Sequence, residues 1–266
     1  MRRGVSNLTS VGFSPPRKNV HSAHMDPETA RPRGVDVWLI SCEPSEELGS
    51  PADLLSVDER ERADRFHREL DRNRFRVIHT AMRMILAQYL SVRPQEVSFS
   101  SAMGVKPALA SQFRGAGIQF NLSHSSELAL LAVAKGAMVG VDVEWINPEF
   151  PIDEIAERFF SAAEISVLNA LTADERVDAF FSCWTRKEAY IKALGEGLFV
   201  PLDSFEVAFG SQRAAALVAA RDNPDELSRW SMYELTVPKD YKAALVVEGS
   251  AHQLRQFRWS QHVQSR

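Results

Sequence analysis

Two acidic side chains, Asp142 and Glu144, stand two residues apart in the segment GVDVEWI. Successive side chains of a β-strand point to opposite faces, so these carboxylates share one face with Gly140 while Val141 and Val143 point to the other. The apolar face belongs to a core, and the acidic face needs a partner. Either a metal ion or bulk solvent would satisfy the carboxylates, and this segment alone does not choose between them.

A second group of ionisable side chains occurs in FFSCWTRKEAYIKALGEGL, residues 180–198. The spacing predicts a helix that ends at the glycines of GEG. Its apolar stripe consists of Cys183, Leu194, Phe180, Ile191 and Trp184. Lys187 falls inside this stripe, where its ammonium group must reach an anion or extend along its stem to solvent. Glu188 and Lys192, four residues apart, line one edge of the stripe and could instead form a surface ion pair.

The segment FNLSHSS ends a predicted strand with small hydroxyls and a histidine, at Ser123 and His124. The core-facing residues of this strand are Ile118, Phe120 and Leu122. Hydroxyl and imidazole groups at a strand end can bind a phosphate, although a single histidine is more often structural. The segment GVKPAL, which contains Lys106, predicts only a loop by itself.

The elements that position these side chains follow from the apolar spacing. Strands are predicted at 35–41, 97–100, 118–124, 128–134, 138–146, 204–209, 231–237, 241–247 and 256–260, helices at 53–66 and 71–89, and two or three further helices between 152 and 194. The apolar run 128–146 contains charges and a Lys-Gly turn, so it predicts a β-hairpin and not a membrane span. The order predicts an α+β fold of two comparable halves, 34–140 and 141–260.

The composition is that of a globular protein. A net charge of -4 over 266 residues, with a pI near 6.0, argues against a protein that coats nucleic acid. Cys42 and Cys183 lie in no CxxC motif, so neither a disulfide scaffold nor a zinc site is expected, and the cytoplasm is the predicted compartment. Residues 1–33, rich in Arg, Ser and Pro, predict a disordered extension. A transit peptide, or a true start at Met25, would also explain that composition.

The motifs in this order resemble those of the 4'-phosphopantetheinyl transferases: GVKPAL, NLSHS, GVDVE and, about forty residues later, WTRKEAYIKALGEGL. The resemblance covers about residues 35–250 and is to the long, monomeric type that activates peptide and polyketide synthases. It implies two similar α+β lobes related by a pseudo-two-fold axis, with coenzyme A and Mg²⁺ in the cleft between them. It also implies transfer of the phosphopantetheine arm of coenzyme A to a serine hydroxyl of an apo acyl or peptidyl carrier protein, with release of adenosine 3',5'-bisphosphate.

The resemblance implies a role for each matching acidic and basic residue. Asp142, Glu144 and Glu188 would bind Mg²⁺, since two carboxylates about 6.6 Å apart along a strand can flank one small cation. Glu188 would also activate the serine, directly or through a water molecule. Lys192 would contact the phosphates directly, and Asp142, Glu188 and Lys192 would be the catalytic set. Gly140 would leave the strand face open for the ligand.

The resemblance also implies a binding site for coenzyme A. The residues that would form it are Arg74, Lys106, Ser123, His124, Lys187 and Lys192. Ser123 and His124 would contact the 3'-phosphate, and Lys187 would reach into the same ionic cleft. Arg74 is one of three arginines in DRNRFR near a predicted helix start, where phosphate recognition is favourable. The chain departs from the family pattern in GVKP, where Gly-Lys-Pro is usual, and at Ser126, where glycine is common.

Two other functional classes remain open from the sequence. A different Mg²⁺-dependent enzyme, such as a phosphohydrolase, could use the same three carboxylates. A protein that binds coenzyme A or a carrier without turnover is the other alternative. A monomer without nucleic-acid or membrane partners is expected, and no residue pattern selects among carriers of fatty acid, polyketide or nonribosomal peptide biosynthesis.

Overall fold

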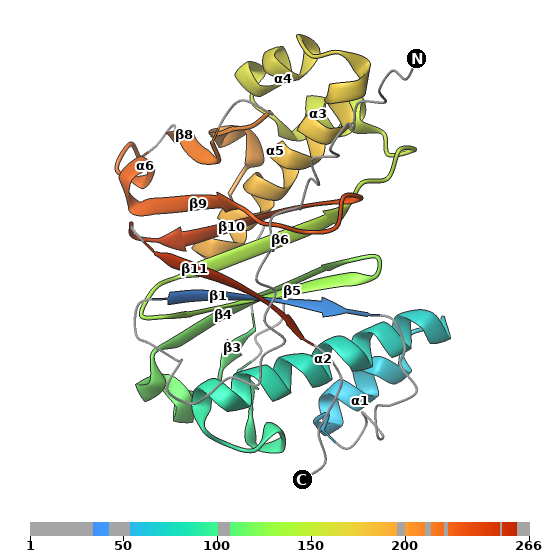
Figure 1. Ribbon diagram of the computed structural model, residues 1–266, viewed down its shortest axis with the longest axis vertical. Coiled ribbons are helices and arrows are strands. Elements are labelled where there is room, and N and C mark those ends of the chain that lie inside the picture. Colours follow the sequence, from blue (N-terminus) through green and yellow to red (C-terminus); the bar gives the residue numbers. More distant parts are fainter. Residues whose placement is uncertain are drawn as a thin grey trace, which may run out of the picture.

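The structure is a computed structural model, and it describes residues 34–42, 54–100, 107–195, 200–210, 214–220, 223–250 and 252–259. Two β-sheets lie face to face at the centre, and helices cover the outer face of each sheet, which gives four layers (Figure 1). The extension at residues 1–33 and the loop residue Lys106 lie outside the described residues. The mixed composition of helices and sheets confirms an α+β protein.

The first sheet has the strand order β11-β1-β5-β4. Its strands are β1 (Gly34–Ser41), β4 (Ile118–Ser125), β5 (Leu128–Lys135) and β11 (Gln253–Trp259). Strand β5 is antiparallel to both of its neighbours, and β11 is parallel to β1. The amphipathic helix α2 (Glu69–Leu90) packs its apolar face on the outer side of this sheet. Helix α1 (Val57–Asp64), which begins at a capping box, packs against α2.

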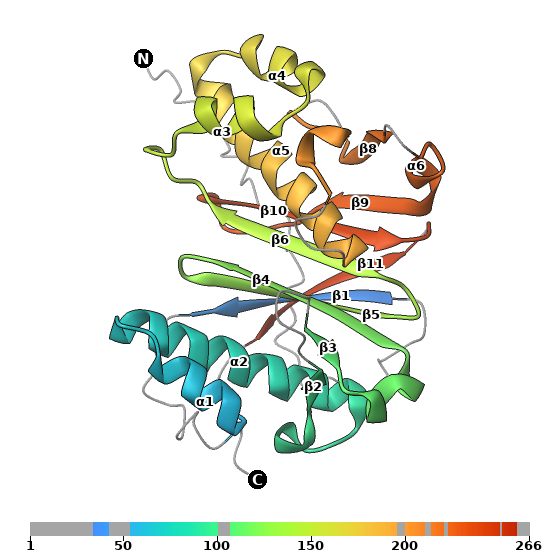
Figure 2. The same ribbon diagram turned by 180° about the vertical axis from the view of Figure 1, so that it is seen from behind.

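The second sheet is antiparallel and has the order β6-β10-β9. Its strands are β6 (Val139–Trp145), β9 (Trp230–Glu234) and β10 (Tyr241–Glu248). Helix α5 (Ala173–Leu194) runs across its outer face, as Figure 2 shows. The smaller elements are α3 (Ile152–Phe159), α4 (Ala162–Asn169), α6 (Glu226–Arg229), the strand pair β2 (Phe99–Ser100) and β3 (Ala108–Leu109), the strand pair β7 (Phe205–Ala208) and β8 (Ala216–Ala220), and 3-10 turns at Pro94–Glu96, Ser111–Ala116 and Leu202–Ser204.

The layer between the sheets is apolar, and β6 contributes one face to it. Val139, Val141 and Val143 are fully buried there against residues of β1, β5 and β10. The alternate residues of β6 therefore face α5, which places Gly140 and Asp142 beneath that helix. The alternation seen in the sequence thus fixes which layer receives the carboxylates.

The longer elements follow the same order in the two halves of the chain, apart from the additional short helices α1, α3, α4 and α6. A strand, a helix of 22 residues, a short strand pair and two further strands occur as β1, α2, β2–β3, β4, β5 and again as β6, α5, β7–β8, β9, β10. The sheet orders β1-β5-β4 and β6-β10-β9 correspond as well, because the last strand of each series lies between the other two.

The β-hairpin expected at 128–146 is wrong. Strand β5 pairs with β1 and β4, whereas β6 pairs with β10 in the other sheet. Strand β5 is buried on both faces, so it takes a central position in its sheet, and the chain crosses between the sheets at the Lys-Gly turn. The expected boundary at 140 and 141 falls inside β6, and β11, placed by the sequence in the second half, joins the first sheet. None of the described helices combines the length and the apolar character that crossing a bilayer requires.

Candidate active site

The side chains of Asp142, Lys192 and Ser123 form a compact polar cluster where β4, β6 and α5 meet. The Lys192 ammonium lies 2.6 Å from Asp142 Oδ1 and donates to Ser123 Oγ at 3.0 Å. Ser123 Oγ in turn donates to Asp142 Oδ1 at 2.9 Å. Burial lowers the pKa of Lys192, but the Asp142 carboxylate outweighs this effect and leaves the pKa raised, so Lys192 carries its charge at neutral pH.

Glu144 lies next to this cluster, one strand repeat further along β6. Ser125 Oγ donates to Glu144 Oε2 at 2.8 Å, and the Trp184 side chain also hydrogen bonds to this carboxylate. Burial and the negative charge of Asp142 raise the pKa of Glu144 in spite of these bonds. Ionisation of Glu144 therefore costs free energy in this site, and a bound cation would lower that cost.

Glu188 stands on α5 one helical turn before Lys192 and faces the same two carboxylates of β6. Burial raises the pKa of Glu188 to about 7, and the negative charges of Asp142 and Glu144 contribute while Lys192 opposes them. A carboxylate with a pKa near neutrality can both accept and release a proton at physiological pH. The described structure thus assembles an acid–base group beside a lysine and two further carboxylates.

Gly140 sets how closely α5 approaches β6. A Cβ atom there would lie 2.1 Å from the Ala189 carbonyl oxygen and 2.3 Å from the Ala193 nitrogen. Both contacts are with helix backbone, so no side-chain rotation could relieve them. The expectation that Gly140 leaves room for a ligand is therefore wrong: the helix fills that space. The absence of a side chain at Gly140 brings Glu188 and Lys192 over the carboxylates of β6.

The acidic residues satisfy the chemistry of a Mg²⁺ site in part. Asp142 Oδ2 is buried and has no hydrogen-bond partner among the described residues, although Oδ1 has two. Oxygen ligands from one or two carboxylates, completed by phosphate oxygens and water, are what Mg²⁺ usually takes. Within the described ranges no three acidic, histidine or cysteine side chains form a ready-made metal site. Asp142 Oδ2 is thus an oxygen atom of this site to which a cation such as Mg²⁺ is chemically suited, while the described carboxylates do not by themselves form a complete ligand set.

Side chains of β4 connect the edge of the first sheet to the edge of the second. The Val141 backbone N–H donates to Asn121 Oδ1 at 2.8 Å, and the Trp145 N–H donates to Ser125 Oγ at 3.0 Å. Asn121 and Ser125 are not among the site residues predicted from the sequence. Their spacing with Ser123, every second residue in FNLSHSS, was the pattern that could have indicated one polar strand face.

His124 and Ser123 are neighbours on β4, so their side chains point to opposite faces of the strand. Their shared contact with one phosphate stays a prediction. His124 lies on the face of β4 toward α2, near His79 and Arg74, where its ring is partly packed while the residue keeps exposed surface. Packing around the ring lowers the pKa of His124, and the positive charges of Lys192, His79, Arg74 and Arg62 add to this effect. His124 therefore lies at a cationic region beside the carboxylate cluster, and Ser123 belongs to the cluster itself.

The three arginines at the start of α2 differ in their partners. Arg74 contacts the Glu127 carboxylate in the turn between β4 and β5, and Asp71 Oδ1 lies 3.7 Å from Arg74 Nη1. Arg72 is bound by Glu69, and Arg76 by Asp64 and Glu69. Glu127 lies two residues after the end of β4, on which His124 stands. Of the three arginines, Arg74 is therefore the one that is held close to His124.

Lys187 does not reach the cluster, contrary to expectation. Its side chain is fully buried, and its ammonium lies 2.7 Å from Glu164 Oε2 and donates to the carbonyl oxygens of Leu202 and Phe205. One residue before Glu188, it points about 100° away around the helix and toward α4 and β7. Its partner Glu164 also accepts from the Val207 N–H. Lys187 therefore joins α5 to the core of the second half.

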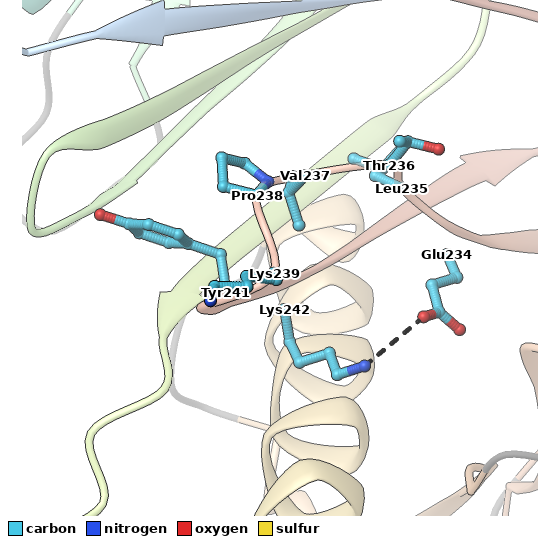
Figure 3. A pocket seen from close by; sticks show the side chains of 8 residues that line it. All are labelled: Glu234, Leu235, Thr236, Val237, Pro238, Lys239, Tyr241 and Lys242. Carbon is cyan, nitrogen blue, oxygen red and sulfur yellow. Dashed lines mark ion pairs between the residues drawn. The ribbon is translucent and has the colours of Figure 1, made fainter. Parts of the chain in front are cut away.

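A pocket of about 450 Å³ lies apart from the cluster, along the connection between β9 and β10 (Figure 3). It is lined by Glu234, Leu235, Thr236, Val237, Pro238, Lys239, Tyr241 and Lys242. Lys242 Nζ lies 2.9 Å from Asp178 Oδ1 and 3.9 Å from Glu234 Oε1, and Arg186 also binds Glu234. Two charged lining residues, Glu234 and Lys242, thus take part in ion pairs, mainly with Arg186 and Asp178 outside the lining.

Comparison with known proteins gives consistent matches over both halves. Residues 138–246 match the 4'-phosphopantetheinyl transferase superfamily, and residues 43–136 match the family described as 4'-phosphopantetheinyl transferase, N-terminal. The chain is 37% identical over 216 residues to the 4'-phosphopantetheinyl transferase HetI of Nostoc sp. (strain PCC 7120), which covers 81% of this chain and 88% of that protein. It is 30% identical to the 4'-phosphopantetheinyl transferase Sfp of Bacillus subtilis (strain 168), over 72% of this chain and 81% of that protein. Among solved structures, holo-[acyl-carrier-protein] synthase (AcpS) of Thermotoga maritima aligns with 42% of this chain and 63% of that chain, at 23% identity and a TM-score of 0.34.

Proposed function

The chain belongs to the 4'-phosphopantetheinyl transferase superfamily and is a phosphopantetheinyl transferase, and from this premise we propose that it transfers the arm of coenzyme A to a serine hydroxyl of an apo acyl or peptidyl carrier protein in a Mg²⁺-dependent reaction. The bond that forms joins the serine oxygen to the phosphorus nearest the pantetheine, and the bond that breaks joins that phosphorus to the bridging pyrophosphate oxygen. The leaving group is adenosine 3',5'-bisphosphate.

In this proposal the carboxylate cluster is the centre of the reaction. Asp142 and Glu144, with Glu188, would hold Mg²⁺ through oxygen atoms, among them the buried Asp142 Oδ2, which has no hydrogen-bond partner among the described residues. Bound Mg²⁺ would reduce the negative charge on the pyrophosphate oxygens. Lys192, charged at neutral pH, would exchange part of its contact with Asp142 for a phosphate oxygen and stabilise the charge that develops there.

Glu188 would take the proton from the attacking serine, directly or through a water molecule. Its pKa of about 7 lets it be ionised when the serine arrives and protonated after transfer. This arrangement of an acid–base carboxylate beside Lys192 and Asp142 is the observation that best supports the proposal, because phosphoryl transfer needs a proton acceptor and positive charge in one place.

Coenzyme A would lie from this cluster toward the cationic region of His124 and Arg74. Ser123, His124 and Arg74 would contact the 3'-phosphate. Ser123 also bonds to Lys192, which would contact the pyrophosphate. Lys106 stays a proposed contact of the adenine-side phosphates. Arg74 is held by Glu127 here, so binding of a phosphate there requires that this ion pair open.

We further propose that the repeated order of elements reflects two lobes related by a pseudo-two-fold axis, with residues 34–140 and 141–260 as their approximate extents, except that β11 of the second range pairs with β1 in the first sheet. The corresponding sheet orders β1-β5-β4 and β6-β10-β9 support this relation. Because both lobes occur in one chain, we propose that a monomer in the cytoplasm is the active form.

The test is release of adenosine 3',5'-bisphosphate, followed by liquid chromatography, from coenzyme A with Mg²⁺ and an apo carrier protein. Asp142→Asn and Glu188→Gln should lose this release while remaining folded, whereas Asp174→Asn, an exposed carboxylate change on the same helix as Glu188, should keep it. Release without any carrier would favour a phosphohydrolase. Coenzyme A binding with no release in the presence of several carriers would favour a silent binder and contradict the proposal.

A further inference from the structure

Ser125 makes two hydrogen bonds that fix the direction of its proton. Its oxygen accepts from the Trp145 backbone N–H at 3.0 Å, and it lies 2.8 Å from Glu144 Oε2. An ionised carboxylate can only accept, so the hydroxyl proton must point to Glu144. Ser125, on β4 of the first sheet, thus connects the Glu144 side chain to the Trp145 backbone N–H, and both of these groups belong to β6 of the second sheet.

The same arrangement occurs one repeat earlier on β4. Ser123 accepts from Lys192 and donates to Asp142 Oδ1, just as Ser125 accepts from Trp145 and donates to Glu144. Two hydroxyls two residues apart on β4 therefore face two carboxylates two residues apart on β6, one to one. For Asp142 this leaves Oδ2 buried and without a described partner.

We propose that Ser125 is a positioning residue that orients the Glu144 carboxylate for a divalent cation, an inference that rests on the proposed function. Hydrogen bonds to a metal-binding carboxylate hold it in one orientation, and loss of such a partner typically lowers metal affinity or activity about 10- to 100-fold. Ser125 is suited to this task because it is itself held by a backbone group. Asn121, which accepts from the Val141 N–H, holds the facing strands at the distance that both serines need.

The experiment compares Ser125→Thr with Ser125→Val, which have nearly the same shape and differ in the hydroxyl. Calorimetric titration of Mg²⁺ into each protein with saturating coenzyme A gives the metal affinity directly, without turnover. The Mg²⁺ dependence of transfer to a carrier gives a second readout as half-saturating concentration and kcat. Ser231→Ala is the matched control, because it removes one part-buried hydroxyl, bonded to the Gly249 carbonyl at 2.7 Å, elsewhere in the second sheet.

We expect Ser125→Val to weaken Mg²⁺ binding about 10- to 100-fold and to raise the half-saturating Mg²⁺ concentration by a similar factor, with kcat at saturating Mg²⁺ much less affected. Ser125→Thr and Ser231→Ala should stay close to the unaltered protein. Equal Mg²⁺ affinity for the Thr and Val variants would overturn the inference, as would no Mg²⁺ binding by the unaltered protein. A further outcome separates the two proposals. If the protein transfers nothing, but Ser125→Val still weakens its Mg²⁺ binding, the proposed function is overturned and this role of Ser125 is supported.

Discussion

Replacing Gly140 with alanine should displace helix α5 from strand β6. The added Cβ would lie 2.1 Å from one helix backbone atom and 2.3 Å from another, whereas ordinary contact begins near 3.4 Å. The strand and the helix must then separate by roughly 1 Å, because close-packed backbone cannot yield as a side chain does. Overpacking costs about 1–3 kcal/mol and occasionally more, and backbone clashes place this variant at the upper end or above. We therefore expect a loss of about 3 kcal/mol in the free energy of unfolding.

The same displacement should impair transfer even where the variant is folded. Glu188 and Lys192 move with α5, and a misplacement of about 1 Å can cost about 100-fold in rate. Urea unfolding gives the stability, and the transfer rate measured well below the unfolding midpoint gives the activity. Gly34→Ala is the matched control, since a Cβ at that strand glycine would meet its nearest atom at 3.5 Å. A Gly140→Ala protein with unaltered stability and rate would refute the account of how the site is assembled.

Further predictions concern the charged groups on either side of the cluster. Lys187→Met should lower the free energy of unfolding by about 3–5 kcal/mol, because it leaves Glu164 buried without its partner. Calorimetry should still find that the folded fraction binds coenzyme A. Selective loss of that binding would show that Lys187 is a ligand of coenzyme A after all. In the protein free of Mg²⁺, the Glu188 carboxyl should titrate near pH 7, because burial and the charges of Asp142 and Glu144 raise its pKa to about 7. Carboxyl-carbon NMR should follow this titration, and a midpoint near the ordinary glutamate value of 4.5 would contradict the described surroundings of Glu188. Glu127→Gln should raise the affinity for coenzyme A about threefold by freeing Arg74 from its ion pair, and unchanged or weaker binding in calorimetry would argue against Arg74 as a phosphate contact.

Local periodicity accounts for the parts of the site that lie on one element. Alternation along residues 139–145 separates the valines from the acidic face, and helical spacing puts Glu188 and Lys192 on one edge of α5. The structure brings Asp142 and Lys192 together at 2.6 Å. The first two relations depend on side-chain directions within a single strand or helix, which the sequence determines, whereas the contact of Asp142 with Lys192 also requires that α5 pack on β6.

Relations between elements were not predictable in the same way. Lys187 lies in the apolar stripe of α5 and is buried in the core, where it pairs with Glu164 of α4. No local sequence pattern connects these two residues, so the pair could not be predicted. Gly140 is explained by the approach of a helix backbone that begins 33 residues later in the chain. The apolar runs of β5 and β6 are consistent with a hairpin, and only the pairing of β6 with β10 assigns them to different sheets. Long-range packing decides each of these cases.

Intact mass spectrometry of an apo carrier protein, incubated with this protein, coenzyme A and Mg²⁺, tests the central claim most directly. We expect the carrier to gain the mass of one phosphopantetheine arm, and Glu188→Gln to remove the gain. A carrier whose mass stays unchanged across fatty-acid, polyketide and peptide types, in the presence of folded protein that binds coenzyme A, would contradict the claim.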